Sequence, residues 1–95
     1  MTTTTTARVA LDNRRIVALA LADLPNELDP ATANGFEFGA KVLIYAAEAA
    51  VQSETYVNVR TFAHRLHREF SSGRLTPFAL GVTLACNRVR YSTAQ

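Results

Sequence analysis

The 95-residue sequence predicts an all-α protein, a small bundle of about four helices with a central, apolar second helix. Apolar residues recur every three or four positions in each long segment, and residues that commonly cap helices precede several of these segments. A hydrophobic fraction of 48% with only three prolines is typical of a folded chain, and the length suits one domain. The expected helices span about residues 12–24, 30–52, 55–72 and 77–90, within a single helical domain over residues 7–95.

The N-terminal part begins with a run of threonines that has no apolar periodicity, so we expect residues 1–6 to form a disordered lead-in. Asp12 or Asn13 can cap the first helix, and Pro25 can end it. A competing interpretation is a short N-terminal hairpin over residues 7–21, which would make the fold α+β. The helix is preferred because the Asp-Asn pair lacks the glycine that two-residue hairpin turns favour.

The second helix carries the clearest signals. Asp29 is a capping residue, and Pro30 after it suits the first helical position. Glu37 and Lys41 are four residues apart, in the order that stabilises a helix. The polar residues occupy one narrow stripe, so most of the circumference is apolar, which is typical of a helix surrounded by protein. Small residues that would let another helix approach closely are Gly35, Gly39, Ala46 and Ala50.

Two further helices are expected in the C-terminal half. In the third, Ser53 or Thr55 can form the N-cap and Gly73 can follow the last turn. Its apolar stripe consists of Tyr56, Val59, Phe62, Ala63, Leu66 and Phe70. The fourth helix begins at Thr76 and Pro77, and its stripe consists of Phe78, Val82, Ala85 and Val89. Apolar residues also alternate in this last segment, which leaves a strand over residues 78–91 as an alternative.

Composition disfavours several classes of protein. The single cysteine cannot form an internal disulfide, so a reducing, cytoplasmic setting is expected. The N-terminus lacks the features of a secretory signal, and the longest apolar stretch is too short to cross a bilayer, so no membrane association is expected. Nine of the ten basic residues are arginine and alanine is abundant, which indicates a GC-rich bacterial, phage or plasmid gene.

Residues that could support catalysis or metal binding are sparse. His64 and His67 are three residues apart but lack the four-residue spacing and adjacent glutamate of a zinc-protease motif, which favours two solvated histidines. A lone cysteine in an apolar helix, such as Cys86, is usually a small buried hydrophobe. The sequence contains no phosphate-binding loop and no nucleophile motif. We therefore expect a protein that is not an enzyme and that binds no metal or cofactor.

The arginines are the strongest functional signal. Up to Glu48 the chain has four basic and six acidic residues, whereas the remainder has six basic and two acidic residues. Arg60, His64 and Arg68 repeat every four residues, which places them along one side of the third helix. The candidate partner- or phosphate-binding residues are Arg60, His64, Arg65, Arg68, Arg74, Arg88 and Arg90.

These residues favour a binding protein. We expect a homodimeric module whose arginine-rich face binds an acidic partner protein, because arginine and aromatic residues are enriched at interfaces. The helix over residues 77–90 is the expected dimer surface. Nucleic-acid binding is the alternative, through phosphate contacts made by the same arginines. Before Asn87 the last helix is apolar on nearly every face, which does not suit a helix that reads bases. A merely solvated arginine face is a further interpretation.

Overall fold

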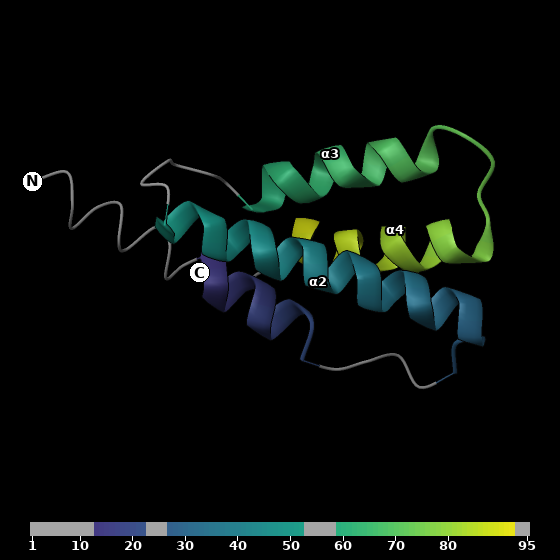
Figure 1. Ribbon diagram of the computed structural model, residues 1–95, viewed down its shortest axis with the longest axis horizontal. Helices are drawn as coiled ribbons and strands as arrows, with labels where there is room; N and C mark the ends of the chain where they lie inside the picture. Colours follow the sequence, from purple (N-terminus) through teal and green to yellow (C-terminus); the bar gives the residue numbers. More distant parts are fainter. Residues whose placement is uncertain (1–12, 23–26, 53–58, 93–95) are drawn as a thin grey trace, which may run out of the picture.

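The structure is a computed structural model, which describes residues 13–22, 27–52 and 59–92. It contains an N-terminal helix over residues 13–20, α2 (Pro30–Gln52), α3 (Val59–Ser71) and α4 (Pro77–Arg90). Along the chain, α2, α3 and α4 alternate in direction, so each is antiparallel to the next (Figure 1). The predicted all-α bundle is confirmed.

Both strand alternatives fail within the described residues. Residues 77–90 form α4, so the strand predicted as an alternative over 78–91 is wrong. Residues 13–20 are helical, which contradicts the hairpin there, while residues 7–12 and the lead-in over 1–6 lie outside the described residues. The N-terminal helix ends at residue 20 rather than near 24. The amide of Leu21 still donates to the carbonyl of Val17 at 3.0 Å, after which the chain turns toward α2.

The starts of α2 and α4 are fixed by the residues that the sequence indicated. The Asp29 carboxylate accepts hydrogen bonds from the Thr32 amide at 3.3 Å and from the Thr32 hydroxyl at 2.5 Å. These bonds lower the pKa of Asp29 below its usual 3.8, the hydroxyl bond having the largest effect. At α4, the Thr76 hydroxyl accepts a hydrogen bond from the Ala79 amide at 3.1 Å, and Pro77 occupies the first turn. Each cap satisfies backbone donors that have no partner inside the helix.

Helices α2 and α4 pack with their backbones in direct contact. A methyl group added at Gly35 would overlap the Phe78 carbonyl, and one added at Gly81 would overlap the Thr32 carbonyl. A methyl group added at Gly39 would lie 3.1 Å from the Ala85 side chain and 3.3 Å from the Val82 backbone, which is tighter than ordinary contact. The close approach expected at Gly35 and Gly39 is therefore confirmed. Ala46 is also buried, whereas the side chain of Ala50 lies outside the description.

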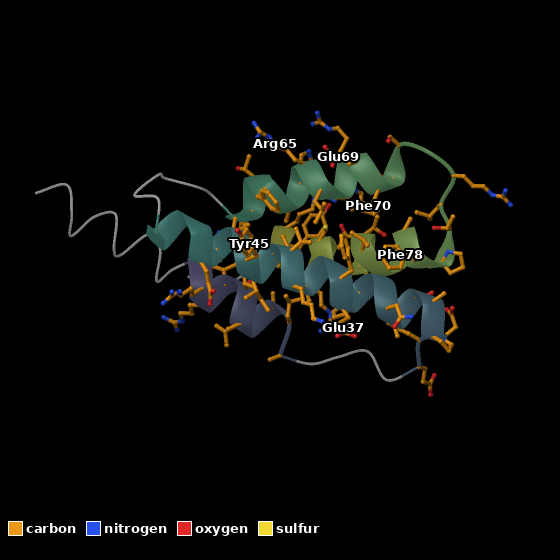
Figure 2. The ribbon with its side chains drawn as sticks, in the orientation of Figure 1. Glu37, Tyr45, Arg65, Glu69, Phe70 and Phe78 are labelled. Carbon is orange, nitrogen blue, oxygen red and sulfur yellow. The ribbon has the colours of Figure 1, made fainter. Side chains whose placement is uncertain are left out.

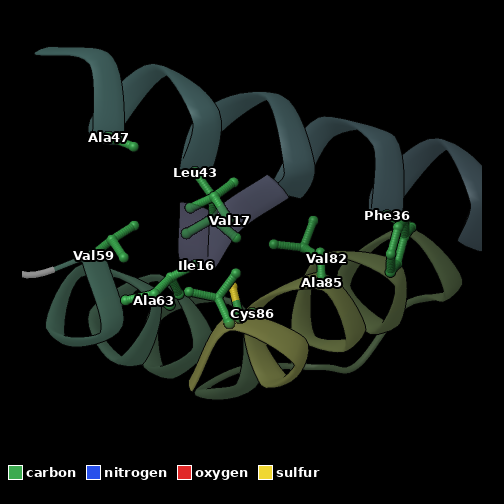
Figure 3. Packing of buried hydrophobic residues seen from close by; sticks show 11 residues of the cluster. Ile16, Val17, Phe36, Leu43, Ala47, Val59, Ala63, Val82, Ala85 and Cys86 are labelled. Carbon is green, nitrogen blue, oxygen red and sulfur yellow. The ribbon is translucent and has the colours of Figure 1, made fainter. Parts of the chain in front are cut away.

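All four helices contribute to one apolar core (Figure 3). Its buried members are Ile16, Val17, Phe36, Leu43, Ala47, Val59, Ala63, Val82, Ala85, Cys86 and Val89. On α3, Phe62, Leu66 and Phe70 are half-buried against this cluster, as their three- and four-residue spacing predicts. Ser53, Thr55 and Tyr56, which were expected in the same helix, lie outside the described residues.

The second helix shares the centre of the bundle with α4. Helix α4 packs against both α2 and α3, and half of its residues are buried. The half of α4 that is buried in the core is therefore not available for the expected dimer surface, whereas Phe78 and Leu80 on the same helix remain exposed. The large apolar side chains that remain exposed on α2 are Phe38, Ile44 and Tyr45. Within the described residues, no helix is both long and apolar enough to cross a membrane.

Candidate functional site

The predicted site residues come from α3, from the loop after it and from the C-terminal end of α4. They fall into three groups that face different surroundings. Arg60 and Arg90 are half-buried where α3 meets the end of α4, His64, Arg65, Arg68 and Arg74 are exposed, and Arg88 points toward α2. One arginine-rich surface was expected, and the packing of α4 divides it.

The first group lies at the C-terminal end of α4. A guanidinium nitrogen of Arg60 donates to the carbonyl oxygen of Ser92 at 2.7 Å. Arg90 donates to the side-chain oxygen of Asn87 at 2.9 Å, and its guanidinium lies 5.1 Å from the centre of the Tyr91 ring. A cation at the carboxyl end of a helix is favoured by the helix dipole. Arg60 and Arg90 therefore stabilise the C-terminal end of α4. Their positive charges serve the fold in this way.

His67 lies beside this group and was left out of the predicted site. Partial burial lowers the pKa of His67 below 6.5, and the nearby charges of Arg90 and His64 lower it further. Among the described residues, no carboxylate contributes to this shift of the His67 pKa. The spacing of His64 and His67 placed them on one side of a helix, but the approach of Arg90 from α4 could only come from the structure.

The exposed group forms what we call the arginine face, which consists of His64, Arg65 and Arg68 on α3. Figure 2 shows Arg65 extending from α3 on the side away from α2. Neither Arg65 nor Arg68 forms an ion pair with a described residue, and the same holds for Arg74 in the following loop. Between residues 59 and 92 the chain has six arginines and a single carboxylate, Glu69. The positive charge of this face thus has little compensation from the residues around it.

Arg88 does not belong to the arginine face. Its guanidinium lies 5.5 Å from the centre of the Phe36 ring, so it covers the core on the side of α4 that faces α2. An arginine over an aromatic ring gains both packing and a cation–π attraction. We therefore assign Arg88 to the fold and not to the candidate site.

Two other candidate sites can be assessed directly. The described residues include no group of three metal-ligating side chains, so His64 and His67 have no third ligand there. Cys86 is buried in the core, and burial raises the pKa of its thiol to about 11. A thiol with such a pKa is protonated at neutral pH and is a poor nucleophile. The interpretation of Cys86 as a small buried hydrophobe is confirmed.

A shallow hollow of about 250 Å³ lies between the N-terminal helix and α2. Val17, Ala18, Ile44 and Ala47 form its apolar walls, and Arg14 and Glu48 also line it. It is smaller than most small-molecule pockets, which span about 300–1,000 Å³. The hollow offers few polar groups with which to orient a ligand.

The sequence and the structure were compared with known proteins. No protein-family model, no curated protein and no solved structure matches this chain.

Proposed function

We propose that this protein is a non-enzymatic binding module that uses the arginine face to bind an acidic partner protein in the cytoplasm. The observation that supports it is that Arg65 and Arg68, on one exposed helix, form no ion pair with a described residue. Like charges placed together repel one another, so a protein gains nothing in stability from such an arrangement. A partner that brings carboxylates would relieve this repulsion and form charge-assisted hydrogen bonds.

The shape of the bundle supports a protein partner over a nucleic acid. A helix-turn-helix reader would insert the second helix of the α3–α4 pair into the major groove. Helix α4 is half-buried in the core and offers no such surface. The arginine face lies on one helix of 13 residues, about 20 Å long, which suits a single acidic helix or loop of a partner. We also propose that the module is a homodimer, since large apolar side chains remain exposed on α2.

The experiment is a titration of the purified protein against two fluorescent probes, poly-L-glutamate and a short DNA duplex. We expect poly-L-glutamate to bind, and the double variant Arg65→Glu, Arg68→Glu to bind it about tenfold more weakly or worse. Arg60 is left unchanged because it holds Ser92. The matched control is Arg14→Glu, Arg15→Glu, which makes the same change of charge on exposed residues of the N-terminal helix.

The two probes separate the possible results. Binding of poly-L-glutamate that is lost in the α3 variant and kept in the control supports the proposal. Preferential binding of the duplex, weakening steeply with salt and accompanied by 260 nm absorbance in the purified protein, would favour nucleic acid instead. If all variants bind poly-L-glutamate equally, the arginine face is only solvated surface and the proposal is wrong.

A further inference from the structure

Five polar side chains lie where α3 passes the C-terminal end of α4, and we call them the basic junction: Arg60, His64, His67, Asn87 and Arg90. The hydrogen bond from Arg60 to the Ser92 carbonyl places the start of α3 beside the end of α4. Because the two helices are antiparallel, residues further along α3 lie level with residues further back along α4 (Figure 1). His64 and His67 lie about 6 and 10 Å beyond Arg60 along α3. Asn87 lies about 8 Å before Ser92 along α4, so it is level with the two histidines.

On α3, the junction residues follow one line along the helix. Arg60, His64 and His67 are separated by four and three residues, which are the spacings of neighbours on a helix surface. Arg60 and His67 are half-buried, whereas His64 is exposed. This line therefore borders α4 and remains open to water along its outer edge.

On α4, the junction residues lie on the flank away from α2. Arg88 marks the opposite flank, because its guanidinium lies over the Phe36 ring of α2. Arg90 is two positions after Arg88, so the two arginines face different sides of the helix. Asn87 and Arg90 are half-buried and joined by a hydrogen bond of 2.9 Å, so the two side chains form one unit.

The junction combines positive charge with hydrogen-bond donors. A guanidinium has five N–H groups, so Arg90 has donors beyond the one that bonds to Asn87. Partial burial lowers the pKa of His67 below 6.5, and the charges that face it, Arg90 from α4 and His64 from α3, lower it further. No described charge of α2 contributes to that pKa, and Glu69, two positions from His67, faces elsewhere on α3. An anion here would therefore meet cations from two helices and no described carboxylate.

We propose that the basic junction binds a phosphate group between His67 and Arg90, and that His67 takes up a proton when the phosphate group binds. A phosphate group carries close to two negative charges and three acceptor oxygens that point in different directions, so it can pair with cations from two helices at once. Its charge favours a protonated imidazole, which Arg90 and His64 alone disfavour. Anion binding and proton uptake therefore promote each other. The site uses α4 as well as α3 and does not rest on the acidic partner proposed above.

The test follows the two histidines of the chain by NMR, with His64→Gln and His67→Gln to assign the two sets of imidazole signals. The pH is titrated in sodium sulfate and in sodium chloride of the same ionic strength. Sulfate serves as the probe because it is tetrahedral and keeps both negative charges throughout the titration of histidine. We expect sulfate to raise the pKa of His67 by about 1, which corresponds to about tenfold tighter binding of sulfate to the protein with His67 protonated. The exposed His64 should respond less.

Arg90→Gln removes the cation that α4 contributes to the junction. In chloride, we expect this variant to have a higher pKa at His67 than the wild type, because a nearby like charge is lost. Sulfate should bind it about tenfold more weakly or worse. Circular dichroism checks that α4 keeps its helix without the bond to Asn87. The matched control is Arg15→Gln, which removes the same charge from an exposed residue of the N-terminal helix and should bind sulfate as the wild type does.

His67→Gln is the second variant, in which the signals of His64 report binding, and it should also bind sulfate more weakly. The proposal is overturned if sulfate leaves the pKa of His67 unchanged in the wild type. Binding of sulfate by the folded Arg90→Gln and His67→Gln proteins as tightly as by the wild type would contradict it as well. In either case the junction serves only the fold.

Two further probes distinguish the sources of the phosphate group: inorganic phosphate represents a small phosphorylated molecule, and a phosphoserine peptide represents a modified partner protein. Equal binding of the two probes supports a site for a small molecule. Tighter binding of the peptide, with the difference lost in the Arg65→Glu, Arg68→Glu protein, supports a phosphate group carried by a partner. If neither probe binds although sulfate does, the assignment to a phosphate group is wrong.

Discussion

Arg60 and Arg90 contribute to the fold, because Arg60 donates to the Ser92 carbonyl and Arg90 donates to the Asn87 side chain at the end of α4. Arg65 and Arg68 make no comparable contact with the described residues. Sequence spacing predicted that Arg60, His64 and Arg68 share one side of α3, because positions on a single helix follow its geometry alone. It could not predict that Arg88 would lie over Phe36, or that Arg90 would lie near His67, because these placements depend on how α4 rotates against its neighbours.

His67 should make the stability of the protein sensitive to mild acid. Its pKa is lowered in the folded state, so folding favours the neutral imidazole. This contribution is fully present above pH 6.5 and is lost as the pH falls below 6.5 toward the folded-state pKa. We expect the free energy of unfolding, measured with urea, to decrease between about pH 7 and pH 5.

The variant His67→Gln tests this assignment, because it should show a smaller decrease over the same interval. Asp29 does not interfere, since its pKa is lowered from 3.8 and its contribution changes only in stronger acid. His64→Gln is the control and should keep most of the decrease. An unchanged pH dependence in His67→Gln would show that another group is responsible.

Cys86 should be unreactive while the protein is folded. Burial raises the pKa of its thiol to about 11, and its side chain is inaccessible in the core. We expect a disulfide reagent such as dithionitrobenzoate to react slowly with the native protein at pH 8 and rapidly in urea. Fast reaction of the native protein would mean that α4 opens readily from the bundle.

At the level of the helices, the features that depend only on residues close in the sequence, such as the N-caps, could be predicted. Asp29 and Thr76 cap α2 and α4 as their sequences indicate, and Pro77 follows its cap. The buried surface of α4 was not predictable in the same way. Its stripe of Val82, Ala85 and Val89 is buried, but so are Gly81, Thr83 and Cys86, because α2 and α3 cover it from two sides.

The contact between α2 and α4 should depend on glycine at position 81. In Gly81→Ala the added methyl group would overlap the Thr32 carbonyl, so the two helices would have to separate. Although alanine is favoured over glycine in a helix by about 1 kcal/mol, we expect a net loss of about 2 kcal/mol. For a chain of this size that loss lowers the melting temperature by about 10 °C.

Thermal denaturation of Gly81→Ala and Gly73→Ala provides the comparison. Gly73 has no atom within 4 Å of the position where a methyl group would be placed. The Gly73→Ala protein should therefore melt within about 3 °C of the wild type. Equal melting temperatures for the two variants would contradict the close packing of α2 on α4.

For the whole molecule, the important property is the separation of charge between its two halves. The segment over residues 59–92 has six arginines and one glutamate, whereas the ion pair that the structure shows, Lys41 with Glu37, lies on α2. The separation was visible in the sequence, because counting charges needs no structure. What the sequence could not show is that Phe38 packs against Phe70 and Phe78 whereas Arg90 lies near His67, since this depends on how the helices pack.

The arginines repel one another, so the fold should become more stable when added salt screens their charges. Raising NaCl from about 0.1 M to about 1 M shortens the screening length from about 10 Å to about 3 Å, which weakens repulsion between exposed like charges. We expect a rise of a few degrees in the melting temperature of the wild type, measured at one protein concentration. The variant Arg68→Glu should gain less stability from added salt than the wild type, because it removes one of the repelling charges.

The same variant should bind poly-L-glutamate more weakly, because it removes a positive charge from the arginine face. Arg15→Glu, on the N-terminal helix, should leave the response to salt nearly unchanged. If Arg68→Glu instead gains as much stability from added salt as the wild type, Arg68 takes no part in repulsion on α3, and the argument for an acidic partner at this face fails.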